Sequence, residues 1–186
     1  MNTAKSTVLF AVLLHENYYL EATAMDKKQA VYKLLDERNI VFEAVEHPAV
    51  YTIEEMDALT LPHPEAVVKN LFLRDAKGKR HFLVVMDKNK SADLKRLRDE
   101  IGCTALSFAS EERLAKYLAL TKGEVTPFGV LNDEERAVEV FFDRDLENRP
   151  LLGVHPNDNT ATVFVSFAGL WRVLKEHGSP LGLVKL

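Results

Sequence analysis

The sequence has few of the residues that mark the commonest kinds of functional site. Cys103 is the single cysteine among 186 residues, so an internal disulfide and a cysteine-based metal cluster are both excluded. The sequence also has no CxxC, HExxH, GxGxxG, GxxxxGK or GxSxG pattern. Thioredoxin-like redox centres, zinc proteases, nucleotide-binding loops and nucleophile-elbow hydrolases are therefore not indicated.

Long apolar runs are lacking as well. The run Val8–Leu14 near the N-terminus is far too short to cross a bilayer. With Lys5 before it and the small residues 22–24 after it, the segment has some features of a secretory signal peptide. We favour the alternative, in which residues 1–25 lie outside the core, either as an N-terminal extension or because the start codon was assigned too far upstream. Residues 26–186 then form one cytoplasmic folded unit.

The remaining composition is that of an ordinary globular protein, with 47% hydrophobic and 28% charged residues. The formal net charge is −4, but residues 69–98 carry ten basic and three acidic side chains, a local excess of +7. Such a patch can hold phosphates on an otherwise acidic protein. The alternative is that these side chains simply lie on the solvent-exposed faces of a hairpin and a helix and bind nothing.

Capping residues and hydrophobic periodicity predict the following elements. Helices are expected after Asp26, Thr52, Ser91 and Ser110, and a last helix over residues 168–177. Strands are expected over residues 40–45, 67–75, 81–86, 103–108, 137–142 and 160–167. Interleaved strands, helices and hairpins without an internal repeat predict a mixed α/β (α+β) domain rather than a doubly wound one.

One predicted strand carries a lysine where an apolar side chain is expected. With period-two alternation, Lys69 shares a face with Val67, Leu71 and Leu73. If that face is buried, the ammonium group needs a partner or a task, since an isolated buried charge is costly. The alternative is a strand end from which Lys69 reaches solvent along its aliphatic stem.

Four segments, in this order along the chain, resemble a known family. They are EHPAVYT at residues 46–52, KNLFLRD at 69–75, GEVTPFG at 123–129 and HPNDNTATV at 155–163. Together they resemble the YbaK/prolyl-tRNA-synthetase-associated editing domains, in particular the free-standing prolyl-tRNA editing proteins. The resemblance runs from about Asp26 to the C-terminus.

The resemblance implies a single compact domain with a mixed, barrel-like β-sheet flanked by helices. The implied activity is hydrolysis of the ester between alanine and mischarged tRNA(Pro), without metal, cofactor or protein nucleophile, and with the substrate 2′-hydroxyl helping to activate water. The implied partners are the acceptor end of tRNA and prolyl-tRNA synthetase, with no role for DNA or membranes. Hydrolysis of another ester, such as cysteinyl-tRNA(Pro), and binding without hydrolysis remain alternatives.

The resemblance also implies site residues. Catalytic roles fall to Lys69, Gly123, Pro127 and His155, with the amides of the GxxxP loop near the scissile carbonyl. Substrate contacts are implied for Asn70, Thr126, Phe128, Gly129, Pro156, Asn159, His47 and Thr52. Such a site suits an activated ester, which needs mainly a positioned water and a stabilised oxyanion. No metal is expected, because His47, His63 and His81 are irregularly spaced, and Cys103 is expected to pack as a small hydrophobe.

Overall fold

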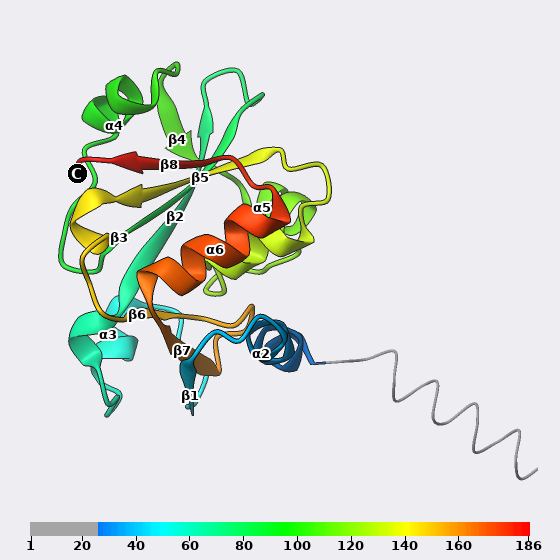
Figure 1. The fold of residues 1–186 in the computed structure, drawn as a ribbon. Helices are drawn as coiled ribbons and strands as arrows, with labels where there is room; N and C mark the ends of the chain where they lie inside the picture. Colours follow the sequence, from blue (N-terminus) through cyan, green and yellow to red (C-terminus); the bar gives the residue numbers. More distant parts are fainter. Residues whose placement is uncertain (1–25) are drawn as a thin grey trace, which may run out of the picture.

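Eight strands form two sheets in the computed structural model, which describes residues 26–186. The larger sheet has the order β4-β2-β3-β5-β8 and the smaller one β1-β7-β6 (Figure 1). The strands are β1 (Phe42–Glu46), β2 (Val68–Asp75), β3 (His81–Asp87), β4 (Leu106–Phe108), β5 (Val138–Asp143), β6 (Leu152–Val154), β7 (Ala161–Val165) and β8 (Leu181–Val184). The expected N-terminal extension over residues 1–25 lies outside the described residues.

Helices connect these strands. The α-helices are α2 (Lys27–Glu37), α3 (Ile53–Asp57), α4 (Leu94–Ile101), α5 (Glu111–Leu118) and α6 (Phe167–His177). Three 3₁₀ turns, η1 (Pro64–Ala66), η2 (Pro127–Asn132) and η3 (Arg144–Leu146), complete the chain. The side chains of Asp26, Thr52 and Ser110 accept hydrogen bonds from the first turns of α2, α3 and α5, so these three predicted caps are confirmed.

The larger sheet is mixed, as predicted. β2 pairs antiparallel with β3 and β4, whereas β5 runs parallel to β3 and to β8. The expectation of a barrel-like sheet is wrong, because the two sheets are joined through one isolated bridge, Val67 to Gly153. β6 is only three residues long, and its ladder is made with β7, so the sheets do not close on each other.

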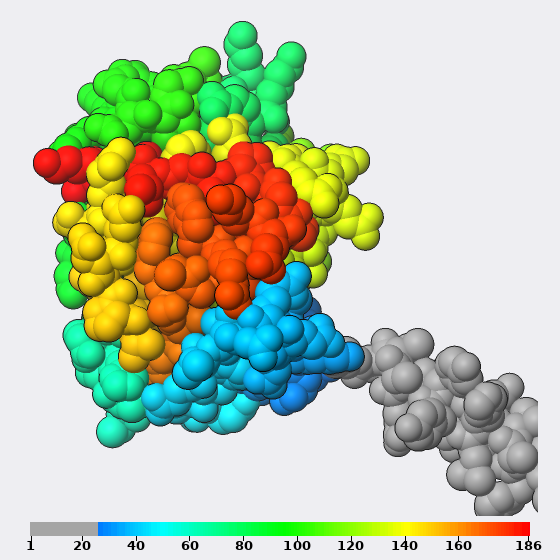
Figure 2. All heavy atoms as spheres, in the orientation of Figure 1, coloured from blue at the N-terminus to red at the C-terminus, as the bar shows by residue number. Residues whose placement is uncertain are grey.

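The larger sheet is covered on both faces. On one face α5 and α6 contribute Leu118 and Leu174 to the main core, to which α2, beside β1, adds Leu35. On the other face α4 places Leu97 against Leu73 of β2. Figure 2 shows α2 and α6 meeting on the surface, where Arg38 and Glu176 form an ion pair of 2.8 Å. A sheet enclosed in this way needs apolar residues on both faces of its central strands, and residues 81–86 of β3 are all buried.

β2 follows the predicted alternation. Val68 and Phe72 belong to the main core, whereas Leu73 and the partly buried Leu71 pack on the α4 side. Lys69 is on the same side of the strand as Leu71 and Leu73, and its side chain is neither fully exposed nor fully buried. The lysine therefore stands at the end of an apolar row.

Three parts of the predicted secondary structure are wrong. The strand expected over residues 103–108 is limited to Leu106–Phe108. Asp93, not Ser91, caps α4, because its carboxylate accepts from the amides of Lys95 and Arg96. β6 and β8 were not predicted. They have three and four residues, which is too short for a period-two pattern to be recognised.

A buried histidine gives the fold a pH dependence. His81 is 1% exposed, its Nε2 lies 2.7 Å from Arg113 Nη1, and its Nδ1 has no hydrogen-bond partner. Burial, and then the charge of Arg113, lowers the pKa of the His81 imidazole. The unfolded chain takes up this proton near the ordinary pKa of about 6.5. Between the two pKa values the unfolded state binds more protons, so stability increases with pH there.

We therefore expect the free energy of unfolding to fall as the pH is lowered from about 7 through 6.5 and below. The variant His81→Phe should show a shallower fall, since a phenyl ring can stack with Phe72 and Tyr117 without titrating. Denaturant titrations of both proteins across this range make the comparison. An identical pH dependence would mean that His81 is not a titrating contributor.

Candidate active site

A pocket of about 300 Å³ opens at the start of β2. Segments far apart in the sequence form its wall, and each of the four segments singled out above contributes at least one lining residue. The lining residues are Val50, Tyr51, Thr52, Ile53, Met56, Val67, Val68, Lys69, Asn70, Leu71, Gly123, Val125 and His155. The set combines one cation and one imidazole with a largely apolar surface, which is typical of small-molecule sites.

The Lys69 ammonium is held by backbone oxygens. Its Nζ donates to the carbonyl of Lys88 at 3.0 Å and also to the carbonyl of Lys90. The turn that carries these carbonyls is itself tied down, since Lys90 Nζ lies 2.5 Å from Asp143 Oδ2 and 2.6 Å from Asp145 Oδ2. An ammonium group has three donors, so one N–H of Lys69 remains for a ligand while the other two fix its position.

Asn70 has an unused acceptor. Its Nδ2 donates to the carbonyl of Val125 at 3.0 Å, which fixes the orientation of the amide group. Its Oδ1 is buried and has no hydrogen-bond partner. Because an unpaired buried acceptor is costly, this oxygen is a candidate acceptor for an N–H or O–H that reaches it from the pocket.

The loop from Gly123 to Val125 approaches the pocket with its backbone. Gly123 has φ +91°, and a Cβ there would lie 2.7 Å from Tyr51 Cδ1. A side chain at this position would therefore be strained and would push Tyr51 away. Within residues 26–186, the amides of Gly123 and Val125 donate to no protein acceptor, so they are available as hydrogen-bond donors.

The rest of this loop supports the pocket from behind. Pro127 starts η2 and is buried together with Phe128 and Gly129. A Cβ on Gly129 would lie 2.6 Å from Leu120 Cδ1. Pro127, Phe128 and Gly129 do not line the pocket, so direct ligand contact by these predicted residues is not supported by the geometry. Thr126 is also fully buried, and its Oγ1 donates to the carbonyl of His155 at 2.5 Å.

His155 lines the pocket, and its ring centroid lies 6.2 Å from that of His47. His155 Nδ1 lies 3.0 Å from the carbonyl of Ala161, so Nδ1 carries the proton and Nε2 keeps a lone pair. Burial lowers the pKa of His155, and the ring is therefore neutral near pH 7. His47 Nε2 lies 2.9 Å from Thr162 Oγ1. His47 does not line the pocket but packs behind His155.

The remaining predicted residues divide into two groups. Thr52 lines the pocket, while its Oγ1 caps α3 by accepting from the Glu55 amide at 3.1 Å. Asn159 lies behind Tyr51, where its Nδ2 donates to the carbonyl of Val50 at 3.2 Å. Pro156 is buried and does not line the pocket. Asn159 and Pro156 therefore shape the loops around the site.

The sequence analysis missed the apolar part of the wall. Tyr51, Ile53 and Met56 come from the segment that enters α3. Tyr51 lies within one of the four resembling segments, and that position was the available signal. No pattern distinguishes Ile53 and Met56 from ordinary core residues.

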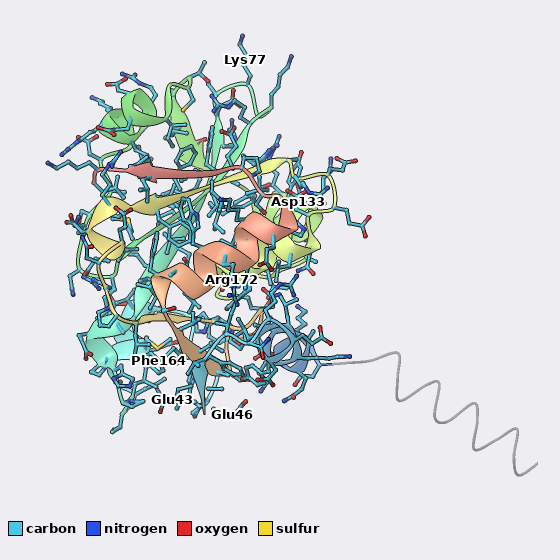
Figure 3. The ribbon with its side chains drawn as sticks, in the orientation of Figure 1. Glu43, Glu46, Lys77, Asp133, Phe164 and Arg172 are labelled. Carbon is cyan, nitrogen blue, oxygen red and sulfur yellow. The ribbon has the colours of Figure 1, made fainter. Side chains whose placement is uncertain are left out.

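The predicted basic patch carries less free positive charge than its number of basic residues suggests. Arg80, Lys88, Lys90 and Arg98 form ion pairs with acidic side chains of the same chain. Among the described residues, no ion pair involves the half-buried Arg74 or the exposed Lys77, Lys79, Lys95 and Arg96 of this stretch. Figure 3 shows Lys77 extending outward beyond the β2–β3 hairpin. The accessible positive charge is thus concentrated away from the pocket.

The histidines considered for zinc lie in different surroundings. His63 packs edge-on against Phe164, with ring centroids 5.2 Å apart, and His81 packs against Tyr117 at 4.1 Å. Within residues 26–186 no group of three His, Cys, Asp or Glu side chains could hold a metal ion. Over the same residues, no helix is both long and apolar enough to cross a membrane.

Chemically, the pocket can bind a small acyl compound and activate it without a protein nucleophile. Its wall contains no cysteine or serine, and the hydroxyl of Thr52 on that wall is used as the cap of α3. Its lining residues include Lys69, Gly123 and Val125, which carry an ammonium group and two unpaired backbone amides, the kinds of donor that stabilise a developing oxyanion. They also include His155, with a neutral imidazole, and Asn70.

Comparisons with known proteins agree with this chemistry. A family model described as an aminoacyl-tRNA editing domain matches residues 47–173. The chain is 55% identical over 162 residues to Prolyl-tRNA editing protein ProX of Acetoanaerobium sticklandii, which covers 87% of this chain and 99% of that protein. It is 35% identical over 158 residues to prolyl-tRNA synthetase associated domain-containing protein 1 of Danio rerio, or 82% of this chain and 83% of that protein.

A solved structure provisionally described as a trans-editing enzyme for prolyl tRNA synthetase has the same fold, with a TM-score of 0.63 at 20% identity over 88% of this chain and 99% of that chain. The family model spans more than half of the sequence, and the ProX relative matches over nearly its whole length. The chain therefore belongs to the aminoacyl-tRNA editing domain family and is an aminoacyl-tRNA deacylase.

Proposed function

We propose that this deacylase removes alanine from mischarged tRNA(Pro), acting in trans on the free aminoacyl-tRNA. The observation that carries the proposal is that Lys69, Asn70, with its unpaired Oδ1, and the Gly123–Val125 loop line one pocket of about 300 Å³. The name of the 55% identical relative, a prolyl-tRNA editing protein, supports the choice of tRNA.

In the proposed reaction, the oxygen of a water molecule attacks the ester carbonyl carbon. The amides of Gly123 and Val125 and the remaining N–H of Lys69 stabilise the charge that develops on the carbonyl oxygen. The bond from the carbonyl carbon to the ribose oxygen then breaks, and the ribose hydroxyl leaves with the proton from water. The neighbouring 2′-hydroxyl of the substrate orients the water, so the protein needs no nucleophile of its own.

Asn70 and His155 orient the substrate in this proposal. Asn70 Oδ1 can accept an N–H of the amino group of alanine, and the lone pair on His155 Nε2 can accept an O–H from the ribose or the water. Neither contact requires the residue to change its protonation state. Pro127 and Thr126 act indirectly, since they hold the loop and the His155 backbone in place.

Selectivity for alanine is proposed to come from the apolar wall. Ile53, Met56 and Val67 line a pocket at the lower end of the size range for ligand sites. One methylene-sized difference changes binding by only about 1–3 kcal/mol, so a cysteinyl ester is the competing substrate. Pure protein incubated with alanyl-, cysteinyl- and prolyl-tRNA(Pro) should release alanine fastest. Faster release of cysteine would show that cysteinyl-tRNA(Pro), not alanyl-tRNA(Pro), is the preferred substrate.

The tRNA acceptor end is the partner that this reaction requires. An association with prolyl-tRNA synthetase in the cytoplasm is the further proposal, supported by the description of the structural relative as a trans-editing enzyme for that synthetase. Co-sedimentation of the two purified proteins, with and without tRNA, tests it. Independent sedimentation under both conditions would remove the synthetase from the proposal.

Cys103 should be dispensable for this reaction. Its Sγ lies 3.9 Å from the carbonyl of Arg98, and burial raises the pKa of the thiol, so the nucleophilic thiolate is disfavoured. It also lies outside the pocket wall. We expect Cys103→Ser to keep its deacylation rate within about twofold, because no protein nucleophile is used. A loss above a hundredfold in a folded variant would overturn this mechanism.

A further inference from the structure

A second groove, of about 280 Å³, adjoins the proposed active-site pocket. The two share four lining residues, Asn70, Leu71, Gly123 and Val125. β4 and the start of α5 provide the outer side of the groove through Phe108, Ser110 and Glu111. A ligand in the active-site pocket can therefore continue into the groove past the Gly123 loop.

Phe108 gives this groove an exposed aromatic surface. Its side chain is 64% exposed, although its backbone is fixed in β4 opposite Leu73. The described residues include three large hydrophobic side chains that are exposed, namely Val41, Tyr51 and Phe108. The two aromatic ones border the adjoining cavities, Tyr51 at the pocket and Phe108 at the groove. A single exposed apolar residue is ordinary, but this placement suits planar ligands.

The charges of the groove are balanced. Lys122 lies on its wall and forms no ion pair among residues 26–186. Glu111 lies on the same wall and repels an anion. The groove therefore fits a neutral ring attached to a single phosphate better than it fits a polyanion.

We infer that the groove binds the base of the 3′-terminal nucleoside of tRNA, stacked on Phe108, while the aminoacyl group occupies the Lys69 pocket. The inference rests on the proposed function. The scissile ester is attached to the ribose of that nucleoside, so the base must leave the pocket on one side. Unpaired bases are commonly held by stacking on aromatic side chains, which contributes about ten- to a hundredfold in affinity per base.

Binding of uncharged RNA tests the groove without requiring hydrolysis. The probes are a short hairpin with the tRNA acceptor sequence ending in CCA and the same hairpin with an abasic terminal ribose. In the wild-type protein, loss of the terminal base should weaken binding about ten- to a hundredfold. Phe108→Ala should bind the intact hairpin equally weakly and should lose nothing further with the abasic hairpin. Equal effects of Phe108→Ala on both hairpins, or no effect on either, would overturn the inference, as would failure of the wild type to bind.

Two variants serve as controls. Phe108→Tyr preserves the ring and should keep wild-type affinity. Val41→Ala truncates a side chain that is 91% exposed and lines neither the pocket nor the groove, and it should have no effect. Because Phe108 is exposed, Phe108→Ala should unfold at the wild-type temperature. Base-dependent binding without any deacylation would leave the groove in place and reject the proposed reaction instead.

Discussion

Replacing Lys69 with alanine is expected to lower the rate of alanyl-tRNA(Pro) deacylation at least about 100-fold, the effect of losing one well-placed electrostatic donor. The ammonium group is fixed by the carbonyls of Lys88 and Lys90, and Lys69 is the one cationic residue among those that line the pocket. Single-turnover deacylation measures the chemical step directly. A fully active Lys69→Ala variant would show that Lys69 has no role in the reaction.

Two further variants separate charge from structure. Lys69→Arg keeps the positive charge and can donate to the same carbonyls, but its planar guanidinium cannot occupy the space of an ammonium group, so it should be folded and slow. Lys77 extends outward beyond the hairpin (Figure 3), and Lys77→Ala should at most weaken tRNA binding and reduce its salt dependence. The thermal unfolding temperature of each variant shows whether a loss of activity is caused by unfolding.

The second large effect is expected at Gly123. An alanine there must adopt φ near +91°, and its Cβ would lie 2.7 Å from Tyr51 Cδ1. We expect Gly123→Ala to lose about 1–2 kcal/mol of stability from the backbone conformation. Displacement of the loop amides by about 1 Å should also lower the deacylation rate about 100-fold. Chemical denaturation and single-turnover kinetics measure the two losses separately.

Gly102 provides the matched control. It has φ +69° at the end of α4, and a Cβ there would meet nothing within 4 Å. Gly102→Ala should lose a similar amount of stability because of the same backbone strain, yet keep its deacylation rate. If Gly123→Ala were as active as Gly102→Ala, the loop amides would not be part of the catalytic machinery.

Much of the fold follows from local rules. Asp26, Thr52 and Ser110 are caps whose side chains reach the first helical turn wherever the rest of the chain lies. The alternation of side chains in β2 could be predicted from the sequence because each face of the strand packs into a different hydrophobic cluster. The relation of the two sheets was not readable, since it depends on the single Val67–Gly153 bridge between distant segments.

The site was predictable to a similar extent. Lys69 was singled out by its misfit with an apolar strand, and it was assigned to the candidate site, with Gly123 and His155, by the resemblance of their segments to the family. Direct ligand contacts for Phe128 and Gly129 could not be tested from the sequence, because short motifs do not reveal which residues face the pocket and which pack behind it. The carbonyls that hold Lys69 were invisible for a different reason, as any residue could supply them.

The most direct test is turnover of alanyl-tRNA(Pro) by a substoichiometric amount of pure wild-type protein, compared with Lys69→Ala. The proposed mechanism predicts that the wild type releases many equivalents of alanine per protein molecule and that Lys69→Ala releases it at least about 100-fold more slowly. A wild-type protein that binds the alanyl-tRNA(Pro) and protects its ester from hydrolysis would contradict the mechanism and identify a binding module.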